Sequence, residues 1–267
     1  MKFKISSIIR FFLLAILWSN CYDGYIHSIQ YPQAFKETDV KDTYFGTIVY
    51  DPYRWLEDDN SAETEAWVQA QNKITFSYLD SIPQKVLIEN RLTKIWDYEK
   101  VSAPFKRGGK YYYYKNEGLQ NQSVLYGVDQ LGDAEKIILD PNTFSEDGTI
   151  ALSGIYFNGE GNLLGYAKSK GGSDWKEFYI HDLTTGKDLE DYLKWIKFSD
   201  MSWAGNGFYY SRFSEPQGGG ELDDVNENSE VYYHKLGTNQ HEDRLIYSDP
   251  ENPQISNYVS TTDDENY

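Results

Sequence analysis

The sequence predicts a mainly β protein in which a helical segment precedes a repeated array of short strands. Three observations support this fold class. Aromatic residues make up 16% of the chain, and tyrosine-rich segments favour strands over helices. Apolar residues at helical spacing are concentrated in residues 60–95. After Trp96, Gly- and Asp-containing turns alternate with tyrosine-rich segments at a regular interval.

The composition indicates a folded protein and excludes one class of partner. Hydrophobic residues make up 40% of the 267 residues and charged residues 25%, which provides enough apolar material for a packed core. The formal net charge is -17, and so acidic a surface repels phosphate backbones. We therefore expect no nucleic-acid partner.

The chain begins with the features of a secretory signal peptide. Lys2, Lys4 and Arg10 form a basic start, and residues 11–18 form an unbroken apolar run. That run is shorter than the ~20 residues that a helix needs to cross a bilayer. We expect residues 1–20 to be removed as a signal peptide, which predicts a secreted or periplasmic protein.

The only cysteine, Cys21, follows this run. A single cysteine excludes internal disulfides and cysteine-rich metal sites. Its position resembles that of the lipidated cysteine in bacterial lipoproteins, although Asn20 is larger than the usual small residue and Trp18 replaces an aliphatic one. Lipidation at Cys21 would anchor the protein to an envelope membrane, and secretion without a lipid is the alternative. Residues 21–30 are then a short linker.

The helical segment follows a turn at Asp51-Pro52. Asn60 and Glu63 resemble a capping box that opens a helix. Apolar residues recur at helical spacing on both sides of Pro83: Ala66, Trp67, Ala70, Ile74, Ile88, Leu92 and Ile95. Residues 60–95 are therefore predicted to be mostly helical. Beyond them, residues 189–195 are the one stretch where a helix remains an alternative to a strand.

Two sets of turn glycines recur at intervals of about 50 residues. The first set precedes aromatic strands: Gly109, Gly161 and Gly207. The second set lies between later pairs of strands: Gly132, Gly186 and Gly237. Four short antiparallel strands fill such a period, which is one blade of a β-propeller. The chain then holds about three blades and, from residue 262, the start of a fourth. Since about four blades are needed to close a ring, the propeller is predicted to be incomplete.

Several longer strings resemble one known family, and they occur in its order. They are Asp51–Asp58, Ala70–Lys73, Tyr111–Tyr114, Gly118–Gln122, Val124–Tyr126, Leu139–Asn142, Gly171–Trp175, Val231–His234 and Leu236–Thr238. From residue 31 onward the chain resembles prolyl oligopeptidase, a serine peptidase of the α/β-hydrolase type. The first string alone is also similar to oligopeptidase B.

The resemblance implies a two-part architecture. Residues 31–95 would be the N-terminal segment of a split α/β-hydrolase domain, and residues 96–267 would be part of a seven-bladed propeller. The family hydrolyses peptide bonds after proline in short peptides with a Ser–His–Asp triad and no cofactor. It carries that triad in its C-terminal portion, so no catalytic residue is expected in this chain.

The resemblance therefore predicts a fragment that is inactive alone and that belongs to an enzyme expected to be a monomer when complete. The end of the chain at residues 264–267, within a turn pattern, agrees with a truncation. A secreted β-propeller module that binds peptides or glycans is the alternative function.

Ser173 is the one residue that resembles a hydrolase nucleophile. It lies in Gly171-Gly172-Ser173-Asp174-Trp175, whereas a nucleophile elbow reads G-x-S-x-G. Trp175 occupies the position of the last glycine, and the string falls inside the strand repeat. We therefore expect Ser173 to have no catalytic role.

The sequence offers no strong metal site. The histidines, His27, His181, His234 and His241, form no pair with metal-ligand spacing, and the two in strands are expected to be structural. The acidic loop at residues 221–230 superficially resembles a calcium loop. It lacks the glycine and the glutamate that such a loop needs at its sixth and twelfth positions, so calcium binding there is a weak alternative.

Phe198 is the one candidate for substrate contact. The match to the family places this aromatic residue where the propeller lines an outer substrate subsite. An aromatic ring there would pack against an apolar side chain of the peptide. A plain core phenylalanine is the alternative.

We predict that the mature protein begins at a lipidated Cys21. The basic start, the short apolar run and the lone cysteine motivate this expectation. Mass spectrometry of the mature N-terminus measures it directly. A different N-terminus, or an unmodified Cys21, would contradict the lipoprotein prediction.

Overall fold

The computed structural model describes residues 29–215 and 225–262. They fall into two compact units, one ending at Arg91 and one beginning at Leu92. The predicted signal peptide and Cys21 lie outside the described residues. Within the two described ranges, no helix is long and apolar enough to cross a membrane.

The first unit begins with a β-hairpin. Strands β1 (Lys41–Tyr44) and β2 (Thr47–Tyr50) pair antiparallel. The 3-10 helix η1 (Arg54–Glu57) follows. The guanidinium of Arg54 contacts the carboxylates of Asp42 on β1 and of Asp51, the latter at 3.2 Å. The charged residues of the first family-like string therefore tie the hairpin to the segment that enters the helices.

Two helices complete the segment that was predicted to be helical. They are α2 (Ala62–Asp80) and α3 (Lys85–Trp96), separated by a break that contains Pro83. The predicted start is wrong by one residue, because Ser61 and not Asn60 is the N-cap. The Ser61 hydroxyl accepts a hydrogen bond from the backbone N–H of Thr64 at 3.1 Å, whereas the Asn60 amide donates to Asp59.

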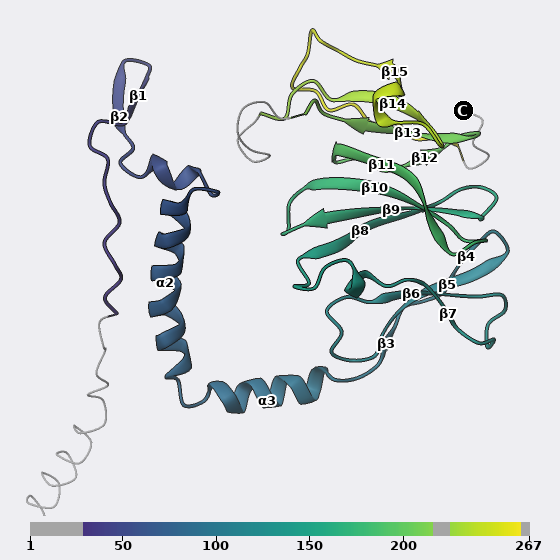
Figure 1. The fold of residues 1–267 in the computed structure, drawn as a ribbon, viewed down its shortest axis with the longest axis horizontal. Helices are drawn as coiled ribbons and strands as arrows, with labels where there is room; N and C mark the ends of the chain where they lie inside the picture. Colours follow the sequence, from purple (N-terminus) through teal and green to yellow (C-terminus); the bar gives the residue numbers. More distant parts are fainter. Residues whose placement is uncertain (1–28, 216–224, 263–267) are drawn as a thin grey trace, which may run out of the picture. The chain divides into compact units, whose positions relative to one another are not determined.

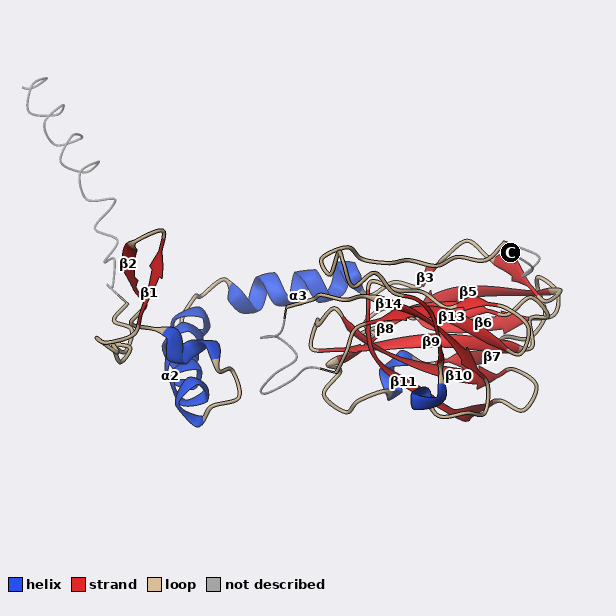
Figure 2. Ribbon diagram, turned by 90° about the horizontal axis from the view of Figure 1, so that it is seen from above, coloured by secondary structure: helices blue, strands red, loops and turns tan. Residues whose placement is uncertain are grey.

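The second unit consists of three antiparallel sheets, in which strands pair in chain order except that the first two strands of the first sheet both pair with its third (Figure 1 and Figure 2). The first contains β3 (Lys100–Val101), β4 (Phe105–Arg107), β5 (Lys110–Asn116), β6 (Val124–Val128) and β7 (Lys136–Leu139). The second contains β8 (Ile150–Phe157), β9 (Leu163–Lys170), β10 (Trp175–Asp182) and β11 (Lys187–Lys197). The third contains β12 (Ser202–Trp203), β13 (Gly207–Arg212), β14 (Glu230–Lys235) and β15 (Arg244–Tyr247). Short 3-10 helices are η2 (Pro141–Thr143) and η3 (Gln240–Glu242).

The sheets follow the predicted repeat, with two corrections. Gly132, Gly186 and Gly237 all have positive φ and lie between the last two strands of successive sheets. Gly109 lies in the turn between β4 and β5 and Gly161 in the turn between β8 and β9, but in the third sheet the corresponding turn, between β12 and β13, uses Gly205, at φ 57°. Gly207 instead begins β13, where a Cβ would overlap the carbonyl oxygen of His234.

The second correction concerns the stretch at residues 189–195, where a helix was the alternative. This stretch is part of strand β11. In β11, buried residues alternate with exposed ones from Asp191 to Leu193, as in a strand that is covered on one face. Pairing with β10 therefore decides the local conformation.

The second sheet is buried on both faces. Phe178 on β10 packs toward β13 of the third sheet, with its ring 6.4 Å from that of Phe208. Tyr166 on β9 belongs to the opposite core, which also contains Tyr112 from β5 of the first sheet. Each such ring contributes roughly 1.5–3 kcal/mol when it is fully buried. Two aromatic cores therefore hold the three sheets together.

A Tyr–Asp–His arrangement recurs in the second and third sheets. In each, a tyrosine hydroxyl and a histidine Nδ1 contact the two oxygens of one carboxylate, at 2.6–2.7 Å. The residues are Tyr166, Asp188 and His181 in the second sheet, and Tyr210, Asp243 and His234 in the third. Both strand histidines are therefore hydrogen-bonded, as expected for structural residues.

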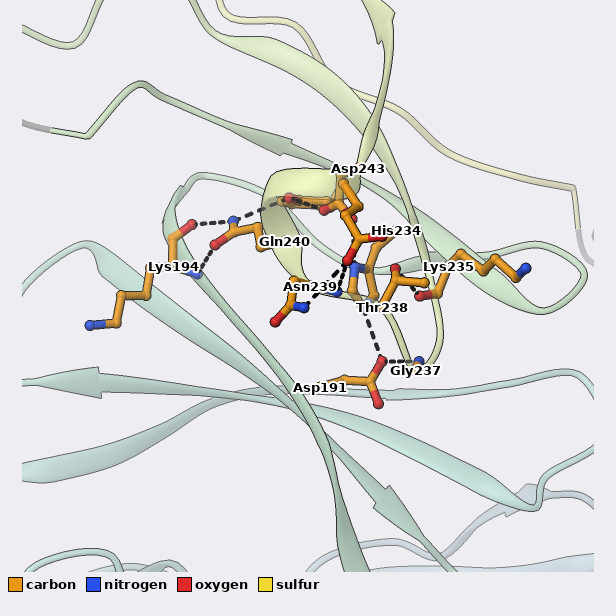
Figure 3. A network of polar contacts seen from close by, with 11 residues as sticks. Asp191, Lys194, His234, Lys235, Gly237, Thr238, Asn239, Gln240 and Asp243 are labelled. Atoms are coloured by element: carbon orange, nitrogen blue, oxygen red, sulfur yellow. Dashed lines mark hydrogen bonds and ion pairs between the residues drawn. The ribbon is translucent and has the colours of Figure 1, made fainter.

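His234 also joins the third sheet to the second (Figure 3). Its Nε2 lies 3.0 Å from a carboxylate oxygen of Asp191 on β11, and that oxygen also accepts the backbone N–H of Gly237 at 2.7 Å. The side chains of His234 and Asp243 are fully buried, and that of Asp191 almost so. Burial disfavours a charged ring, but the hydrogen bonds to Asp191 and Asp243 outweigh it and raise the pKa of His234 to about 9.

We predict that part of the stability of the chain is lost in mildly alkaline solution. Because the pKa of His234 is raised from 6.5 to about 9 on folding, its contribution is complete below pH 6.5 and disappears as the pH rises through 9. Urea unfolding measured from pH 6 to pH 10 should show the free energy of unfolding falling across that window.

The control is a pair of histidine variants at equivalent positions. His234→Gln should lower the free energy of unfolding by about 3–5 kcal/mol at pH 7, because two buried carboxylates lose their cation. The same variant should also remove most of the fall in the free energy of unfolding between pH 6.5 and 9. His181 contacts a carboxylate side chain that is 48% exposed. His181→Gln should therefore lower the free energy of unfolding by about 1 kcal/mol or less. Equal effects of the two variants would contradict this account.

Candidate functional site

Phe198 lies where the chain leaves β11 and turns toward β12. Its side chain is 49% exposed and its backbone has φ 55°, an uncommon conformation for an aromatic residue. The next residue, Ser199, is buried, and its hydroxyl accepts the backbone N–H of Ser211 on β13 at 2.8 Å. Lys176 donates to the carbonyl oxygen of Ser199 at 3.3 Å. A rigid turn therefore presents an exposed aromatic ring.

An aromatic cluster lies beside this turn. The ring of Trp175 meets those of Trp195 and Phe213 edge to face, at 5.8 and 6.1 Å between centroids. The ammonium of Lys197 lies 4.8 Å from the Trp175 ring and 5.7 Å from the Phe198 ring. Such a surface can hold an apolar or aromatic side chain of a ligand. The role of Phe198 in substrate binding stays a prediction.

The sequence analysis named Phe198 alone and missed the residues around it. A signal was available in Lys194-Trp195-Ile196-Lys197, where two cations and an indole share a strand end. Trp195 also has a positive φ, of 60°. Two aromatic residues in this uncommon conformation, three positions apart, mark the end of β11 as irregular.

Ser173 lies in the turn between β9 and β10. Its hydroxyl accepts the backbone N–H of Trp175 at 3.2 Å, which stabilises the turn. Across residues 29–215 and 225–262, no hydrogen bond joins a histidine to a Ser or Thr hydroxyl, so no nucleophile–base pair is formed there. The geometry gives Ser173 a structural role.

The described part of the chain contains no arrangement of side chains typical of a metal site. There, no group of three or more His, Cys, Asp or Glu side chains is placed to hold a metal ion. The acidic loop at residues 221–230, the weak calcium alternative, begins within residues 216–224, which the structure does not describe.

Comparison with known proteins gives consistent results. A family model described as "Prolyl oligopeptidase, N-terminal beta-propeller domain" matches residues 32–267. Among curated proteins, a prolyl endopeptidase from Elizabethkingia miricola is 47% identical over 244 residues, covering 90% of this chain and 34% of that protein. A prolyl endopeptidase from Elizabethkingia meningoseptica is 48% identical over 242 residues, with the same two coverages.

Solved structures agree with the sequence matches. Prolyl oligopeptidase B from Galerina marginata, bound to a 35mer hydrolysis and macrocyclization substrate, superposes with a TM-score of 0.74 at 30% identity. The match covers 88% of this chain and 36% of that one. The chain thus spans about a third of the length of the relatives it matches. It belongs to the prolyl oligopeptidase family, whose N-terminal β-propeller domain its residues 32–267 match.

Proposed function

We propose that this chain is the N-terminal part of a secreted serine endopeptidase that cleaves short peptides after proline. The observation that carries the proposal is the match of residues 32–267 to the family, together with 47% and 48% identity to two prolyl endopeptidases. The three aromatic-cored sheets provide the scaffold on which such an enzyme would admit peptides.

The chemistry of the reaction is assigned to parts of the enzyme beyond this chain. Amide hydrolysis by this route needs a nucleophile, a general base and an oxyanion hole in one preorganised site. In the described residues no hydrogen bond joins a Ser or Thr hydroxyl to a histidine, and the relatives are about three times as long as the matched region. We assign no catalytic residue to residues 1–267.

The exposed surface of α3 supports the proposal that a separate catalytic portion completes the enzyme. Every residue of α3 is exposed, and its large apolar side chains include Leu87, 71% exposed, and Val86, 62% exposed. Apolar patches on this scale mark surfaces that other protein covers. The helical segment would then pack against the catalytic portion of the complete enzyme.

Export and anchoring belong to the same proposal. The leader at residues 1–20 would direct the enzyme out of the cytoplasm, and lipidated Cys21 would hold it at an envelope membrane. The sequence pattern of the leader supports this location.

A second candidate is a binding module that holds peptides without cleaving them. The exposed Phe198 ring and the neighbouring indoles favour this function, because aromatic surfaces hold peptide side chains in the absence of any catalysis. Proline-directed cleavage by the complete protein would distinguish the two.

We predict that residues 1–267 alone do not hydrolyse prolyl peptides. The purified chain and the complete enzyme are assayed side by side with a chromogenic Gly-Pro substrate, after the mass of each has been confirmed. Only the complete enzyme should release the chromophore. Turnover by the chain that Ser173→Ala abolishes would overturn both the proposal and the structural role of Ser173.

We predict that Phe198→Ala in the complete enzyme weakens cleavage of long peptides more than of minimal ones, because only long peptides reach an outer subsite. Loss of one partial aromatic contact costs about 1 kcal/mol, or roughly fivefold in kcat/KM. Leu189→Ala, on the preceding strand β11 and 37% exposed, is the control and should change the cleavage of neither substrate. Equal losses for long and minimal substrates would indicate a packing role.

A further inference from the structure

A small pocket in the second sheet is lined by an unusual number of cations. Its volume is about 130 Å³. Its lining residues come from β8, β9, β10 and β11 and from the turn that contains Ser173, and these four strands pair side by side in the second sheet (Figure 1). Ten residues line it: Ile150, Lys168, Ser169, Lys170, Ser173, Trp175, Lys176, Glu177, Lys194 and Trp195. Four lysines and one glutamate thus surround it, in a chain whose net charge is -17.

The lysines of the pocket are near acids but form no close ion pair with them: Asp188 and Glu177 act on Lys168, and Glu177 and Glu215 act on Lys194. Within residues 29–215 and 225–262, ion pairs form at other lysines, such as Lys85 and Lys115, and none forms at the four lysines of the pocket. The one acid that lines the pocket, Glu177, already accepts the hydroxyls of Tyr179 and Tyr192, at 2.7 and 2.6 Å. The lining therefore carries more positive than negative charge, which attracts an anion.

Lys168 gives the pocket a partly buried cation. Its ammonium lies 4.3 Å from the ring centroids of both Phe144 and Tyr179. Burial lowers the pKa of Lys168, while Asp188 and Glu177 oppose that effect. An anion bound beside this ammonium would stabilise its charged form.

The size and the lining of the pocket select the kind of anion. A space of about 130 Å³ accepts a single anionic group with a little of its attached body, and excludes a nucleotide. Ile150 and the two indoles, Trp175 and Trp195, also line the pocket and offer apolar contact. A carboxylate attached to an apolar or aromatic residue satisfies both requirements, whereas inorganic phosphate uses only the lysines.

We propose that this pocket binds the C-terminal carboxylate of a short peptide whose last residue is apolar or aromatic. The lysines hold the carboxylate by charge-assisted hydrogen bonds, and the indoles contact the side chain. The binding is separate from any peptidase activity and is a property of this chain alone.

Calorimetric titration of the purified chain tests the proposal with two probes, acetyl-Gly-Phe as the free acid and as the C-terminal amide. The acid should bind about tenfold more tightly than the amide, which corresponds to one charge-assisted hydrogen bond. Raising the salt concentration from 50 to 500 mM should weaken the binding of the acid and leave that of the amide unchanged. Equal affinity for acid and amide, or no binding of the acid, would overturn the proposal.

Matched lysine variants locate the site. Lys170 and Lys194 are exposed, so Lys170→Gln combined with Lys194→Gln should leave the unfolding temperature unchanged. The double variant should bind the acid about tenfold more weakly. Lys187→Gln removes a charge from an exposed position at the start of the same strand β11 and should have no effect. An equal loss of affinity with Lys187→Gln would show a general charge effect and refute the peptide assignment. Inorganic phosphate that competes for the site as strongly as unlabelled acid does would refute it in the same way.

Discussion

The second sheet has two apolar faces, and this constraint governs the whole second unit. Side chains alternate across a strand, so Phe178 points to one neighbouring sheet while Tyr179 points to the other. A sheet of this kind is stable only between two others. The stacking of β8–β11 between the first and third sheets therefore follows from the composition of its own strands.

The buried charged groups between the second and third sheets are hydrogen-bonded to one another. A carboxylate in the third sheet receives both a phenol and an imidazole, and the same imidazole reaches Asp191 in the second sheet (Figure 3). Burying an isolated charge would cost several kcal/mol, so the three charged groups are stable only as a set. The set also specifies how the third sheet is placed on the second, which apolar contacts alone do less sharply.

The same rigid stack accounts for the surface at the end of β11. The buried residues of β11 fix this strand on the sheet, and at its end Trp195 and Phe198 both adopt positive φ. Their rings, with Trp175 and the lysines of the neighbouring strands, form a surface that combines aromatic contact with positive charge. In the proposed peptidase, this surface would bind peptides and take no part in the chemical step.

The sequence by itself determined the features that depend on local chemistry. A turn that needs positive φ selects glycine, so Gly132, Gly186 and Gly237 marked the repeat, and the family strings gave Phe198 its proposed role. Tertiary structure decided what depends on distant partners. Asp191 lies 43 residues from His234, the lysine-lined pocket draws on four strands, and residues 189–195 form a strand because β10 pairs with them. No local pattern encodes such contacts, since they exist only after the strands have been brought together.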